Sequence, residues 1–187
     1  ALNMEFEEKD LAAKVFHGKK DKLLYILELS YKKYYNLLYN YGLKLTNDSE
    51  LVQDFIQEIF TKLCKRENID NISNIKIYLL RAMRNIIYDY YAAQKDIVSI
   101  DDMELIPDDD EVFKTFFSKN DEELQKYQTL LQTINSLPNQ QKQILYLFYI
   151  KGLTHKEISE VLDINPQSSM NSLAKSIRKL RIQFGQI

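Results

Sequence analysis

Glycine and proline are scarce along this chain, which contains only 4 Gly and 3 Pro among 187 residues. Both residues interrupt regular helices, so their scarcity favours a chain that is mostly helical. Apolar and aromatic residues also recur at intervals of three and four, which is the spacing of one helix face. Hydrophobic residues make up 45% of the chain, a content that can form a core. The sequence therefore predicts an all-α protein.

Charge divides the chain into three parts. Residues 1–95 contain 15 basic and 13 acidic side chains, whereas residues 96–123 contain 2 basic and 11 acidic ones. Residues 124–187 contain 8 basic and 3 acidic side chains, a net charge of +5 that suits a phosphate partner. Acidic blocks disfavour packing, and Pro107 interrupts any helix in the middle part. We therefore predict two small helical domains, 1–95 and 124–187, joined by an acidic flexible linker at 96–123.

The first domain is predicted to be a helical bundle that begins with a tyrosine-rich helix over 4–41. Gly42 is expected to end or loosen this helix. Asn47 or Asp48 is then placed to cap a second helix. The expected buried face of the tyrosine-rich helix contains Leu24, Leu27, Tyr31, Tyr34, Tyr35 and Leu38.

The second helix of this domain has a clear apolar stripe, which Cys64 is expected to continue as a packed, inert thiol. A polar loop at 67–76 follows, and a third helix covers 74–95. The buried stripe of the second helix contains Val52, Phe55, Ile56, Ile59, Phe60 and Leu63. That of the third helix contains Ile77, Leu80, Met83, Ile87 and Tyr90.

The second domain is predicted to have four helices, and its last two give a signal for DNA binding. Thr154 and Glu157 match the reciprocal capping box Thr-x-x-Glu, which starts a short helix. After a tight turn, Asn165 and Pro166 cap and start the final helix. A helix-turn-helix places such a second helix in the major groove of DNA. Helix pairs of this kind also occur without a DNA function.

No motif for catalysis or cofactor binding is found. The sequence has no Gly-rich phosphate loop, and one cysteine with two histidines is too small a set for a typical zinc site. His155 stands inside the capping box and is expected to be solvated. A single cysteine allows no internal disulfide, and no apolar run reaches membrane-spanning length. We therefore expect a cytoplasmic protein that is not an enzyme and holds no metal or cofactor.

Five short motifs, spread over nearly the whole chain, resemble those of one family. They are DFIQEIF at Asp54–Phe60, Lys-Ile-Tyr-Leu at 76–79, Ala-Met-Arg-Asn at 82–85, Leu-Pro at 137–138 and GLTHKEISEVLDI at 152–164. The family is the extracytoplasmic-function (ECF) group of bacterial RNA polymerase sigma factors. Each motif alone is modest, but their order and spacing around an acidic segment are specific.

The resemblance implies an alternative sigma factor that binds core RNA polymerase, directs it to promoters and helps to melt the −10 region. The first domain would read the −10 element and the second the −35 element. The implied partners are the polymerase β′ and β subunits, promoter DNA and an anti-sigma factor. The implied polymerase contacts are Asp54, Gln57, Glu58 and Thr61.

The same resemblance implies two DNA-binding sets of residues. The set for the −10 element contains Asn68, Asn71, Ser73, Lys76, Arg81, Arg84, Asn85 and Tyr88. The set for the −35 element contains Thr154, Gln167, Ser168, Met170, Asn171, Lys175, Arg178, Lys179 and Arg181. The basic members suit phosphates, which position a protein on DNA without specifying a sequence.

The chain departs from the family where DNA would be read. The final helix begins without a positive charge, and Met170 and Ser172 stand where the family commonly has Lys or Arg. Two interpretations follow: a −35 element of unusual sequence, or weak intrinsic reading with recruitment by another DNA-bound or RNA-guided protein. The first is favoured.

Two alternatives of a different class also stand. A plain helix-turn-helix regulator would use the second domain without needing the DFIQEIF face. A sigma-like adaptor would bind polymerase or an anti-sigma factor without starting transcription.

Overall fold

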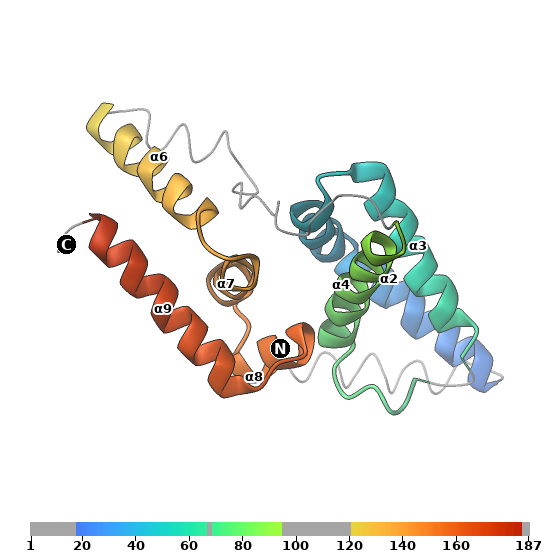
Figure 1. The fold of residues 1–187 in the computed structure, drawn as a ribbon. Helices are drawn as coiled ribbons and strands as arrows, with labels where there is room; N and C mark the ends of the chain where they lie inside the picture. The colour runs from blue at the N-terminus through green and yellow to red at the C-terminus, as the bar shows by residue number, and fades with distance from the viewer. Residues whose placement is uncertain (1–17, 67–68, 95–120, 185–187) are drawn as a thin grey trace.

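The computed structural model describes residues 18–66, 69–94 and 121–184, and these segments are built from helices and their connections (Figure 1). The all-α prediction is confirmed. The helices are α2 (Lys19–Thr46), α3 (Ser49–Cys64), α4 (Ile75–Ala93), α6 (Asp121–Asn135), α7 (Asn139–Leu145), the π-helical turn η2 (Tyr146–Ile150), α8 (His155–Leu162) and α9 (Pro166–Phe184).

Helices α2, α3 and α4 pack on one another as the N-terminal domain. Gly42 lies inside α2, so the expectation that it ends the helix is wrong. A Cβ atom at this position would come within 2.9 Å of Val52 Cγ1 and 3.3 Å of Met83 Sδ. The missing side chain therefore allows α3 and α4 to approach the α2 backbone closely. The helix ends instead at Asn47, whose left-handed backbone (φ 53°) donates its N–H to the Leu43 carbonyl.

The buried face of α2 differs from the predicted one. Leu24 and Tyr31 are among the exposed large hydrophobic side chains, at 43% and 37%. Leu27 and Leu38 are buried as predicted, and Leu23, which was not part of the predicted face, is buried as well. The aromatic run misled the prediction, because tyrosines satisfy a helical apolar pattern and yet tolerate water at the hydroxyl. The part of the predicted helix before residue 18 lies outside the described residues.

Helix α3 follows its predicted pattern, since every member of its expected stripe is buried. Asp48 is its N-cap and accepts a hydrogen bond from the Leu51 N–H. Cys64 is exposed, so the expectation of a packed thiol is wrong. It is the last residue of α3, directly after the buried Leu63. On α4, four members of the expected stripe are buried and Tyr90 is partly buried.

The C-terminal domain contains α6 to α9, in agreement with the prediction of four helices. Helix α6 begins at Asp121, so the last three residues of the predicted linker are helical; residues 96–120 of that linker lie outside the described residues. Gly152 has φ +65° and turns the chain between η2 and α8. The capping box of Thr154 and Glu157 is formed, and Asn165 accepts from the Ser168 N–H at the start of α9.

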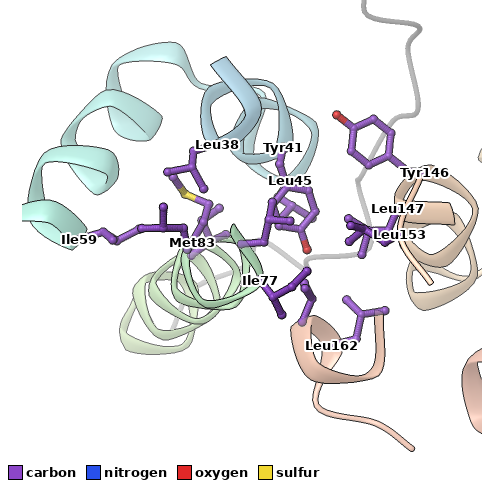
Figure 2. Close-up of a cluster of buried hydrophobic side chains, with 14 of the residues drawn as sticks. Leu38, Tyr41, Leu45, Ile59, Ile77, Met83, Tyr146, Leu147, Leu153 and Leu162 are labelled. Carbon is purple, nitrogen blue, oxygen red and sulfur yellow. The ribbon is translucent and has the colours of Figure 1, made fainter. Parts of the chain in front are cut away.

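The two domains are in direct contact in this structure. Helix α8 packs against α4, which Figure 1 shows where the two halves of the molecule meet. In Figure 2, Tyr146, Leu147, Leu153 and Leu162 of the C-terminal domain face the side of the N-terminal domain that carries Tyr41, Leu45 and Ile77. The buried apolar residues of both domains therefore form one continuous cluster.

Candidate functional site

An exposed polar face runs along α3, opposite its buried stripe. Asp54, Gln57, Glu58 and Thr61 are all exposed, one or two helical turns apart. Glu58 also pairs with Lys62 at 2.6 Å, an exposed contact between neighbouring turns of the helix. Because the opposite side of α3 packs on α2 and α4, the helix holds this face in a fixed orientation. Such a face suits binding to another protein more than chemistry within a pocket.

The predicted −10 set divides into two groups. Asn71, Ser73 and Asn85 are exposed, and Lys76 is half-buried at the start of α4. Asn74 caps α4 by accepting from the Ile77 N–H, which fixes the end of the loop. Asn68 lies outside the described residues.

Arg81, Arg84 and Tyr88 form the second group, on the side of α4 that turns toward the other domain. Arg81 Nη2 donates to Asp163 Oδ1 at 2.9 Å. Tyr88 accepts a hydrogen bond from Gln143 Nε2 at 3.1 Å. The Arg84 guanidinium lies over the Tyr88 ring, 4.2 Å from its centre. All three side chains are therefore engaged in or beside the domain contact.

The helix-turn-helix is formed by α8 and α9. Thr154 uses its hydroxyl within the capping box, where it accepts from the Glu157 N–H and donates to the Glu157 carboxylate at 2.9 Å. His155 is half-buried rather than solvated, which corrects the expectation. Its Nδ1 lies 2.9 Å from Ser169 Oγ, and its ring stacks on Phe148. This bridge ties α8 to the start of α9.

The start of α9 carries neutral polar groups and one exposed apolar side chain. Gln167 Nε2 donates to Asn171 Oδ1 at 3.0 Å, so these two amides lie side by side. Met170 is 45% exposed, and Ser168 is half-buried. No charged residue occurs in Pro166–Ala174.

The later turns of α9 carry the cations. Lys175, Arg178 and Arg181 are exposed, whereas Lys179 Nζ donates to the Ser136 carbonyl at 3.1 Å. An open groove of about 410 Å³ follows the helix. Its lining combines apolar side chains with two arginines: Met170, Leu173, Ala174, Ile177, Arg178 and Arg181.

Two family models match the chain in the two domains just described. The Sigma-70 region 2 model matches residues 30–97, and the Sigma-70 region 4 model matches residues 127–180. The ECF RNA polymerase sigma factor SigM of Bacillus subtilis is 26% identical over 156 residues, which cover 83% of this chain and 93% of that protein. The chain belongs to the ECF group of sigma factors. It is therefore an alternative sigma factor, which directs RNA polymerase to promoters.

Other relatives agree with this assignment. RNA polymerase sigma factor SigZ of the same bacterium is 29% identical to this sigma factor and covers 72% of it, with 73% of SigZ matched. The co-crystal structure of the sigma factor RpoE with the anti-sigma factor NepR from Bartonella quintana has the same fold. The match has a TM-score of 0.56 and 13% identity, and it covers 84% of this chain and 95% of that one.

Three residues at the domain contact were missed by the sequence analysis. Tyr41 and Gln143 are almost fully buried there, at 0% and 1% exposure, and Asp163 pairs with Arg81. The available signal was weak: Gln143 is a polar residue directly before the apolar run 144–148. Nothing in the sequence indicates which surface this residue meets.

Two absences hold for the described segments. None of their helices combines the length and apolar character needed to cross a membrane. Within the same segments, His, Cys, Asp and Glu side chains form no group of three or more that could hold a metal ion.

Proposed function

We propose that the sigma factor divides its work between two domains, 1–95 and 124–187, joined by the segment 96–123. The N-terminal domain binds the β′ subunit of core polymerase through the exposed face of α3 and holds the melted −10 strand beside the 67–76 loop and Asn85. The C-terminal domain contacts the β subunit and reads the −35 element with α9. The acidic segment occupies basic nucleic-acid channels of the polymerase until RNA displaces it.

The α3 face carries the proposal for the polymerase. Four polar residues that do no packing stand together on a rigid helix, in a segment that the region 2 family model matches. Exposed polar side chains contribute little to the stability of the fold, so binding to another protein is the simplest explanation for this face.

A triple replacement of Asp54, Gln57 and Glu58 by alanine tests this assignment. The variant should keep its helical circular dichroism, since all three side chains are exposed, and should bind core polymerase at least tenfold more weakly. The matched control replaces two acids and one amide elsewhere: Glu28, Asn36 and Asp89, all exposed on α2 and α4. Equal polymerase binding by both folded variants would refute the assignment.

For DNA, exposed groups on each reading helix support the proposal. Asn85 can contact a base edge or a flipped base. On α9, Gln167 and Asn171 present neutral amides that suit adenine, and Met170 suits a thymine methyl. Lys175, Arg178, Lys179 and Arg181 would bind phosphates, although Lys179 must first leave the Ser136 carbonyl.

Recruitment by a second DNA-bound or RNA-guided protein is the other candidate for promoter selection. The uncharged start of α9 and the partly apolar groove beside it favour this alternative. A tethered partner raises the local concentration of the promoter and can replace missing phosphate contacts.

The remaining proposals concern where the protein acts, whether it catalyses a reaction and which partner regulates it. We infer that the protein acts in the cytoplasm, where polymerase and DNA are, and catalyses no reaction itself. RpoE, the sigma factor with the same fold, was crystallised with an anti-sigma factor, and this supports control of the present chain by such a partner.

A further inference from the structure

We propose that His155 is a positioning residue for promoter reading: by bonding to Ser169, it fixes the orientation of the first turns of α9. The proposal rests on the function proposed above, because it takes α9 as the helix that reads the −35 element. His155 acts through Ser169 and is assigned no contact with DNA. Its effect is on how accurately the side chains that face the base pairs are aimed.

The contact between His155 and Ser169, the His155–Ser169 bridge, joins two helices and is braced by a third element. His155 is the first residue of α8, and its Nδ1 lies 2.9 Å from Ser169 Oγ in the first turn of α9. Either group can donate in this bond, depending on which ring nitrogen carries the proton. The imidazole ring also stacks on Phe148 of η2, with the ring centres 4.9 Å apart. Ser169 is fully buried, so its hydroxyl is kept from water and held against the histidine.

The buried side of α9 is unusually polar. Between Pro166 and Gln183, the buried residues are Ser169, Leu173 and Ser176. Apolar packing is non-directional, so one buried leucine restrains rotation of the helix about its own axis less than a hydrogen bond does. The hydrogen bonds between α9 and its neighbours therefore contribute strongly to its orientation.

The bridge lies where the neutral reading groups are, at the start of α9 beside α8 (Figure 1). Other bonds hold the later turns of the helix. Ser176 Oγ bonds to Gln141 Oε1 at 3.2 Å, and Lys179 Nζ donates to the Ser136 carbonyl at 3.1 Å. The bridge instead restrains the turn that carries the segment 167–171, in which no residue is charged.

A small rotation of α9 would be enough to disturb contacts with bases. Side chains extend about 5–6 Å from the axis of an α-helix, so a rotation of about 20° moves their tips by roughly 2 Å. Hydrogen bonds to base edges tolerate only about half an ångström of change in length. Long, flexible lysine and arginine side chains can follow such a movement and keep their phosphates. Loss of the bridge should therefore reduce selectivity among sequences more than the overall affinity for DNA.

Three substitutions in the full chain separate the hydrogen bond from the packing of the ring. His155→Phe keeps a ring beside Phe148 but cannot bond to Ser169, and Ser169→Ala removes the same bond from the other side. His155→Asn places an amide group as many bonds from the backbone as Nδ1, so it should restore most of the function. The double variant His155→Phe with Ser169→Ala should lose no more than either single variant, because both remove one shared interaction.

The matched control is Ser159→Ala. Ser159 is a buried serine of α8, like Ser169 in chemistry, but its hydroxyl donates to the Lys156 carbonyl within the same helix. This variant therefore loses a buried hydroxyl without losing a bond between α8 and α9. Circular dichroism checks that each variant is folded. If His155→Phe does not fold, Ser169→Ala, which removes a single oxygen atom, carries the test.

Hydrogen exchange in the free protein tests the positioning without DNA. Mass spectrometry follows the backbone amides of residues 166–173. We expect exchange about tenfold faster in His155→Phe and Ser169→Ala, because the first turn of α9 has lost a bond to α8. His155→Asn and the control should exchange at nearly the wild-type rate. Equal exchange in all folded variants would overturn the proposal.

Promoter selectivity is measured with the sigma factor bound to core polymerase. The probes are a promoter found from the transcripts that the wild type starts, and the same promoter with its −35 element scrambled. Loss of the bridge should lower the ratio of the two affinities about tenfold and change the affinity for poly(dG-dC) by less than about twofold. A general structural defect would lower both affinities together. An unchanged ratio in variants with faster exchange would overturn the role in reading.

Failure of the proposed function would be visible separately. If the wild type starts no transcripts with core polymerase, the proposed function is wrong, and hydrogen exchange alone then decides whether the bridge positions α9.

Discussion

Among single residues, Asn85 is the exposed polar group best placed for the melted strand, since its neighbours Arg81, Arg84 and Tyr88 are engaged elsewhere. We predict that Asn85→Ala lowers open-complex formation about tenfold, because one base contact is lost while the α3 face is untouched. Permanganate reactivity of promoter thymines measures the opening. Asp89→Ala, one turn further along α4, is the control, and equal opening by both variants would place the strand elsewhere.

Gly42 gives a prediction about stability. Alanine is the better helix former by about 1 kcal/mol, but here its Cβ would lie 2.9 Å from Val52 Cγ1. Overpacking a tight helix contact costs about 1–3 kcal/mol, so Gly42→Ala should lower the free energy of unfolding. Urea denaturation measures the change. Asn36→Ala, exposed on the same helix, should leave stability equal or slightly higher; a more stable Gly42→Ala would show that the helices can move apart.

Residue-level predictions from sequence failed where one side chain has two plausible environments. Cys64 fits the apolar period of its helix, yet the helix ends there and leaves the thiol exposed. His155 fits a solvated cap, yet it bridges Ser169 and stacks on Phe148. The environment of Cys64 depends on where its helix ends, and that of His155 depends on contacts with other helices. A local sequence pattern contains neither kind of information.

At the scale of elements, the first turns of α9 carry no charge, so we predict that this sigma factor binds duplex DNA weakly. We also predict that its DNA affinity falls only slightly as the salt concentration rises. Adding two cations there, Met170→Lys with Ser172→Lys, should strengthen binding and steepen the logarithmic salt slope by about 0.9 for each new phosphate contact. Titration of DNA binding with salt measures the slope. The neutral pair Met170→Gln with Ser172→Gln is the control. An unchanged slope in the lysine variant would show that this face does not lie along the phosphates.

Helices with a strict apolar period and a cap could be predicted well from sequence. The stripe of α3 and the capping box of α8 are as expected, because local side-chain chemistry determines both. Helix α2 was harder, since its many tyrosines make several faces look apolar. Its true buried face depends on Gly42, whose role is visible only when α3 and α4 are packed against it.

At the scale of the whole molecule, the sequence indicated two domains but not that they touch. The contact joins residues about 50 to 100 positions apart, such as Tyr88 and Tyr41 with Gln143. Helical periodicity gives no information about contacts between positions so far apart. The sequence around Gln143 would also be the same whether its side chain met water or a neighbouring domain. The predicted sets for polymerase and DNA were likewise given by motif resemblance, which did not indicate that Arg84 and Tyr88 lie in or beside the domain contact.

The central claim, that this chain starts transcription at specific promoters, can be measured on genomic DNA from its own organism. Core polymerase is incubated with that DNA, with and without the sigma factor, and the 5′ ends of the transcripts are sequenced. We predict a limited set of new 5′ ends that require the sigma factor and share elements near −10 and −35. A stable complex with core polymerase that yields no new 5′ ends would contradict the claim and leave a sigma-like adaptor.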